Sequence, residues 1–171
     1  MRLSRKGGTH VAFLYGLDAA FADFILGTIP DIARLPAVQA AMEKYTSGYL
    51  NKSRLTTVMT TVSYPLVELG PVNPPATAWC DHNTIRVGTS YFQFYKNLIG
   101  SYSIWVPVTF FHELAHWGCR MRQQDGHSLD RHGREHDGHG GFGSPLNTEL
   151  ERVLRAQKFF VPAPTRPTRA A

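Results

Sequence analysis

The chain has 171 residues, of which 43% are hydrophobic and 18% are charged, and this composition excludes an intrinsically disordered chain. Its length suits one domain over residues 1–171, with flexible ends at 1–17 and 162–171. The formal net charge is +5, but the basic residues are scattered. We therefore expect this charge to support solubility and weak association rather than a specific nucleic-acid site.

The start of the chain resembles a weak secretory signal, because Arg2, Arg5 and Lys6 precede the apolar residues 11–17. Asp18 ends this apolar run early, and no clean cleavage site follows, so we predict an uncleaved start or a mature domain. The destination, cytoplasmic or exported, stays open. No apolar run approaches the ~20 residues that a membrane-spanning helix needs, so we predict no membrane span.

Residues 18–46 are predicted to be helical, because they supply apolar side chains at helical spacing. Gly27 and Pro30 are expected to break this run, and Pro36 is expected to open a second helix.

Segments with strand character follow. Residues 55–62 and 66–69 are rich in β-branched and other apolar residues and are predicted as strands. Residues 84–88 are predicted as a short strand, and residues 91–98 as an aromatic-rich helical stretch. The sequence thus predicts an α+β domain with a small mixed sheet.

The most convincing helix is predicted from Pro107 to Met121, because Pro107 suits a first helical position and an apolar stripe follows at helical spacing. Residues 122–143 contain many glycines and four histidines with little apolar content, so they are predicted to form a long functional loop. Ser144 and Pro145 are expected to start a final helix.

The predicted helix 107–121 carries the motif His112-Glu113-Leu114-Ala115-His116, which matches the pattern H-E-x-x-H. Side chains four residues apart lie on the same face of a helix, so His112 and His116 can bind one Zn²⁺. Glu113 is then placed to act as a general base toward water and as a general acid toward the leaving amine. The motif predicts a zinc metallopeptidase, a hydrolase with a protein or peptide substrate.

The third zinc ligand is less clearly marked. A metzincin would carry Gly at position 119 and His at position 122, and the chain has Cys119 and Arg122 instead, so that subclass is excluded. In the final helix Glu149 borders the apolar face, whereas Glu151 points away from it, so the spacing favours Glu149 as the ligand.

A histidine of the loop 122–143 is the alternative third ligand. His132 is the first candidate, and the fallback candidates are His127, His136 and His139. A donor to the oxyanion is also expected from this loop, with His132 or His136 in that role.

A family resemblance runs through the second half of the chain. The segments that follow, in order, the pattern of the ArdC-like metallopeptidase domain are 109–118, 128–131, 141–144 and 149–150, and Asn83–Gly88 looks like the strand before its active helix. The resemblance covers residues 83–158. It implies a zincin fold with a small mixed sheet packed on the active helix, and Glu149 as the third zinc ligand.

Residues 1–82 contain no recognisable counterpart of the single-stranded-DNA-binding domain that precedes the ArdC peptidase. In its stand-alone size the chain looks as similar to another group, the metallopeptidase effector domains that bacteria deliver through type VI secretion. Those domains are fused to VgrG spike proteins. The segment 132–135 is similar to the third-ligand region of SprT-like proteases. These resemblances imply a protease that acts as an effector, a toxin or an antirestriction protein.

The alternative interpretation is a metal-stabilised module that binds nucleic acid or a protein without catalysis. Its support is the net charge and an aromatic cluster that can stack bases, Tyr91, Phe92, Phe94 and Tyr95, although we expect these side chains to lie in the core. Cys80 and Cys119 form either one disulfide or two buried thiols, and their spacing favours neither.

Overall fold

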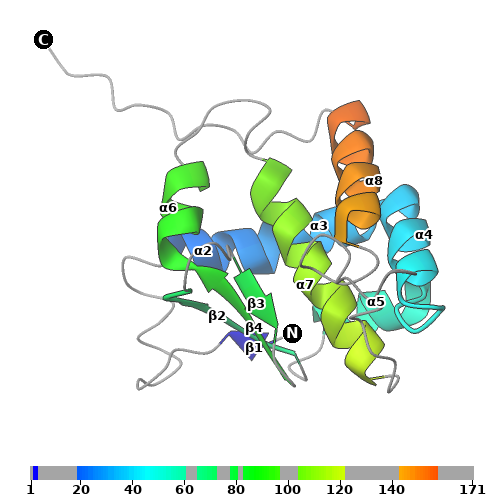
Figure 1. The fold of residues 1–171 in the computed structure, drawn as a ribbon, viewed down its shortest axis with the longest axis horizontal. Coiled ribbons are helices and arrows are strands. Elements are labelled where there is room, and N and C mark those ends of the chain that lie inside the picture. The colour runs from blue at the N-terminus through cyan, green and yellow to red at the C-terminus, as the bar shows by residue number, and fades with distance from the viewer. Residues whose placement is uncertain are drawn as a thin grey trace, which may run out of the picture.

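The fold is taken from a computed structural model that describes residues 2–3, 19–60, 65–72, 78–80, 83–96, 104–121 and 143–157. These residues form an α+β arrangement in which helices lie beside a small mixed sheet (Figure 1). The predicted α+β class with a mixed sheet is therefore confirmed. No described helix is long and apolar enough to cross a membrane.

The described strands are ordered β1-β2-β4-β3, with bounds β1 (Arg2–Leu3), β2 (Leu66–Gly70), β3 (Ala78–Cys80) and β4 (Thr84–Gly88). β1, β2 and β4 are parallel, and β3 pairs antiparallel with β4. Ile85 and Val87 on β4 are fully buried and alternate with partly exposed residues, so one face of the sheet belongs to the core. The strands predicted at 66–69 and 84–88 are confirmed.

The first described helical region consists of α2 (Ala19–Asp23), a π-helical turn η1 (Phe24–Thr28), α3 (Ile29–Ala33) and α4 (Pro36–Tyr45). Pro36 opens α4 as predicted, but Gly27 and Pro30 do not interrupt the helical path. The π-helical turn runs through Gly27, and Pro30 lies in the first turn of α3, where a missing backbone N–H costs little.

The strand predicted at 55–62 is wrong, because Lys52–Thr60 form helix α5. Asn51 caps this helix: its side-chain oxygen accepts a hydrogen bond from the backbone N–H of Arg54 at 3.0 Å. The threonine hydroxyls donate back to carbonyls one turn earlier, for example from Thr56 to Lys52 at 2.8 Å. Capping and burial of the apolar side of α5 thus outweigh the strand preference of its β-branched residues.

The remaining helices are α6 (Thr89–Lys96), α7 (Trp105–Met121) and α8 (Gly143–Ala156), which confirm helices in the three regions predicted. α7 begins two residues before Pro107. The predicted loop at 122–143 lies outside the described residues except for Gly143, which opens α8 instead. The predicted flexible ends, apart from residues 2–3, also lie outside the described residues.

Helix α7 is the central element of the fold. It contacts β3 and β4 as well as α8 and α4, and Figure 1 shows it between the sheet and these two helices. Its described side chains are buried on nearly every side, as expected for a helix enclosed by other elements. At Gly118 the turn after α4 comes so close that an added Cβ would lie 2.9 Å from Leu50. The motif of α7 therefore lies in the interior, closely packed by the neighbouring elements.

Candidate metal site

His112 and His116 face each other on consecutive turns of α7. Their Nε2 atoms lie 3.1 Å apart, and their ring centroids are separated by 4.8 Å. Both residues are buried, with exposed fractions of 4% and 8%. The helix therefore brings the two predicted zinc ligands together with the same ring nitrogen directed at a common point.

The first histidine is also held from α8. Nδ1 of His112 lies 3.1 Å from Oδ1 of Asn147. An amide oxygen only accepts hydrogen bonds, so Nδ1 of His112 carries the proton and donates it. The Nε2 atom of the neutral ring then keeps its lone pair and accepts the hydrogen bond from Nε2–H of His116, a proton that a bound zinc would displace. Sequence reasoning passed over Asn147, and no local signal could have identified it, because the contact joins residues 35 positions apart.

This pair fits zinc. Two ligand atoms of a tetrahedral zinc with bonds of about 2.0–2.1 Å lie about 3.3–3.4 Å apart. The observed Nε2–Nε2 distance of 3.1 Å is close to this value. A ligand histidine whose second ring nitrogen donates to an oxygen is also the usual arrangement around zinc. His112 and His116 could thus supply two ligands without a rearrangement of the backbone.

Glu113 lies next to the first histidine and is only 8% exposed. A buried carboxylate loses the solvation that water gives it, whereas an apolar residue would pack at this position without that cost. The presence of an acid at such a position favours a chemical role over a packing role.

Glu149, the predicted third ligand, lies on another side of α8. Its carboxylate pairs with Nζ of Lys44 on α4 at 2.9 Å, and this hydrogen bond lowers the pKa of Glu149. Side chains two positions apart on a helix differ by about 200° in direction, so Asn147 and Glu149 point to different flanks of α8. With Asn147 turned toward His112, the structure does not bring Glu149 to the histidine pair.

The other third-ligand candidates are not at the pair either, as far as the structure describes them. Glu151 pairs with Arg155 at 2.6 Å. Within the described ranges, no three His, Cys, Asp or Glu residues form a group that could hold a metal. The loop candidates lie outside the described residues: His127, His132, His136 and His139. The identity of the third ligand stays a prediction.

The variant Glu149→Gln decides between the two predicted routes. We expect its zinc affinity to stay within a few-fold of the original, because the carboxylate is directed at Lys44. The ion pair contributes stability above the ordinary pKa of Glu and loses it as the pH falls through the lowered pKa of the folded state. In the variant, the free energy of unfolding should therefore fall slightly less steeply as the pH is lowered. Zinc competition and unfolding curves measure both effects; a hundredfold loss of zinc affinity would instead make Glu149 the ligand.

Cys80 and Cys119 are both buried and do not form a disulfide, which settles the open question of their pairing. The Cys119 thiol points to the backbone oxygen of Tyr45 at 3.6 Å, and burial raises its pKa to about 11.

Of the aromatic cluster predicted as a possible base-stacking surface, the structure describes the side chains of Tyr91 and Phe92. Phe92 is 3% exposed and packs edge-to-face on Phe21, with ring centroids 5.0 Å apart. The hydroxyl of Tyr91 lies 2.7 Å from that of Thr109 on α7. Phe92 therefore belongs to the core, as expected, and the partly buried Tyr91 packs against it, while the side chains at 94 and 95 lie outside the described part.

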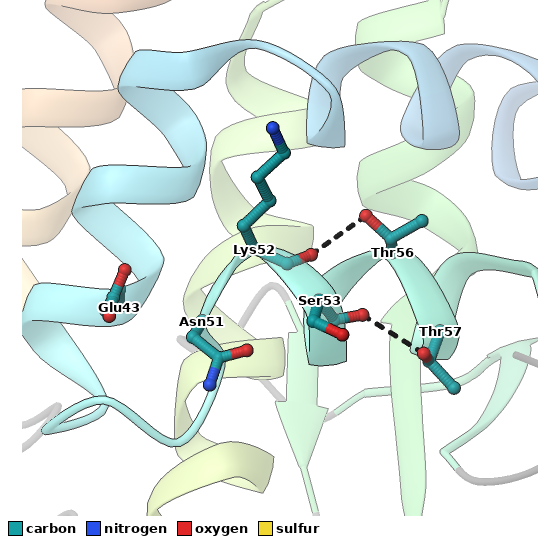
Figure 2. Close-up of a pocket in the computed structure, with 6 residues that line it drawn as sticks. All are labelled: Glu43, Asn51, Lys52, Ser53, Thr56 and Thr57. Carbon is teal, nitrogen blue, oxygen red and sulfur yellow. Dashed lines mark hydrogen bonds between the residues drawn. The ribbon is translucent and has the colours of Figure 1, made fainter.

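A separate surface pocket lies where α4 and α5 meet, and its lining residues are Glu43, Asn51, Lys52, Ser53, Thr56 and Thr57 (Figure 2). The hydroxyls of Thr56 and Thr57 already donate to carbonyls of α5. No residue of the histidine motif lines this pocket, so it is distinct from the candidate metal site.

Comparisons with known proteins add no relative. No family model matches the chain, and searches of the curated proteins and of the solved structures give no match either. The resemblance to the ArdC-like metallopeptidase domain therefore stays a prediction from the sequence.

Proposed function

We propose that this chain is a zinc-dependent metallopeptidase with a zincin-like domain, in which His112 and His116 bind zinc and Glu113 is the catalytic residue. The observation that carries the proposal is the convergence of two buried imidazoles, with Nε2 atoms 3.1 Å apart, next to a buried carboxylate. These are two of the metal ligands and the general base that metal-assisted hydrolysis needs.

The chemistry follows from these residues. When bound, zinc supplies Lewis-acid activation of water and of a carbonyl group. Glu113 takes the proton of the attacking water and passes it to the nitrogen of the leaving amine. His112 and His116 act as neutral ligands, and the rigid packing of α7 keeps their rings and the carboxylate in fixed relative positions.

The sheet supports a peptide as the substrate. Among the described strands, β3 has a single neighbour, β4, and it also contacts α7. An edge strand offers backbone N–H and C=O groups with which an extended peptide can pair. An extended peptide bound along β3 would therefore lie beside the helix that carries the histidine motif.

The binding-module alternative has less support. Of its proposed stacking surface, Phe92 lies in the core and Tyr91 is partly buried against it. A purely structural zinc site is usually closed by four protein ligands and needs no adjacent carboxylate. A cellular role as effector, toxin or antirestriction protein rests only on the sequence resemblance and is part of this proposal.

Removal and return of the metal test the proposed activity. The purified chain should hydrolyse an unfolded protein substrate, lose this activity when a chelator removes zinc, and regain it on addition of one equivalent of zinc. The readout is the appearance of new amino termini. Hydrolysis that persists after complete zinc removal would contradict the proposal.

A further inference from the structure

We propose that Asn147 is a positioning residue that fixes His112 in the tautomer able to bind zinc through Nε2. The proposal rests on the proposed function and adds a residue of α8 to the metal site. The contact that carries it is the 3.1 Å separation between Oδ1 of Asn147 and Nδ1 of His112.

The tautomer matters because a neutral imidazole has only one nitrogen with a free lone pair. If Nε2 of His112 carried the proton, this atom could not bind a metal. The acceptor oxygen of Asn147 holds the proton on Nδ1 and so leaves the lone pair on Nε2, which is the atom directed at His116. An oxygen partner of this kind also fixes the plane of the ring.

The position of Asn147 is set by packing. Its neighbours on the same side of α8, Leu146 and Leu150, are fully buried, and α8 contacts α7. On another flank of α8, the ion pair between Glu149 and Lys44 fastens this helix to α4. The amide is therefore presented by a helix that contacts both α7 and α4.

Three variants separate this role from a general effect on α8. Asn147→Leu keeps the branched shape of the side chain but removes the acceptor, whereas Asn147→Asp keeps an oxygen at that position. Thr148→Leu changes the adjacent exposed residue and is the matched control. Zinc affinity is measured by competition with a chromophoric chelator, and ¹⁵N NMR of the metal-free protein reports which nitrogen of His112 carries the proton.

We expect the Nδ1–H tautomer of His112 in the metal-free original protein. The zinc affinity of Asn147→Leu should fall by about 10–100-fold, that of Asn147→Asp should be retained, and that of Thr148→Leu should be unchanged. Detection of the Nε2–H tautomer of His112 in the original protein would overturn the inference, and this measurement needs no variant. Equal zinc affinity of a folded Asn147→Leu variant would overturn it as well.

The same experiment distinguishes this inference from the proposed function. If the original protein binds no zinc, the proposed function fails, while the NMR result still reports the hydrogen bond. If the original protein binds zinc and the Leu variant binds it equally well, the proposed function stands and the role of Asn147 is refuted.

Discussion

Replacing Glu113 with Gln is expected to lower the rate of peptide hydrolysis by about 10²–10⁴-fold, which is the usual contribution of a general base. The amide keeps the size of the side chain but cannot take a proton from water. Because the metal contacts come from His112 and His116, the zinc affinity of the variant should stay the same. Initial rates on a peptide library and zinc titration measure the two quantities on the same sample.

Glu43→Gln is the control for this variant, because Glu43 is an exposed glutamate that lies away from the histidine motif. It should retain full activity. If Glu113→Gln hydrolysed peptides at the original rate, the assignment of the general base would be wrong. Zinc binding by the original protein without any hydrolysis would instead point to the alternative of a non-catalytic module.

Replacing His116 with Ala is expected to weaken zinc binding by about 10²–10³-fold. The binding free energy of a structural zinc site is about 10–16 kcal/mol. An equal share for one ligand of four corresponds to the expected change of about 10²–10³-fold in affinity. The variant should also lose the rise in melting temperature that zinc gives to a protein that binds it only when folded. Zinc competition and thermal unfolding with and without the metal measure these effects.

His10→Ala is the matched control, because it removes a histidine that belongs neither to the motif nor to the loop of candidate ligands. Its zinc affinity should equal that of the original protein. If His116→Ala kept tight zinc binding, the zinc site would have to lie elsewhere in the chain.

The parts of the fold that follow from local patterns could be predicted from the sequence. Helix α7 was predictable because its apolar residues recur at helical spacing, and this placed His112 and His116 on one face. Helix α5 was missed because its threonines and Val58 favour strands, while the Asn51 cap and the burial of Leu55 outweigh that preference.

The third-ligand prediction shows the limit of helical geometry. Glu149 does border the apolar face of α8, as the spacing indicated, but two helices pack along this face. Glu149 lies toward α4, where Lys44 pairs with it, and Asn147 lies toward α7. The sequence could not tell which flank faces the histidines, since that depends on how α4, α7 and α8 pack together.

Anomalous diffraction at the zinc absorption edge, on crystals grown with zinc, tests the central claim most directly. The account predicts one peak about 2.0–2.1 Å from Nε2 of both His112 and His116, with Glu113 near the metal but not bound to it. A zinc-containing crystal in which these two nitrogens remain in contact with each other, with no peak between them, would contradict it.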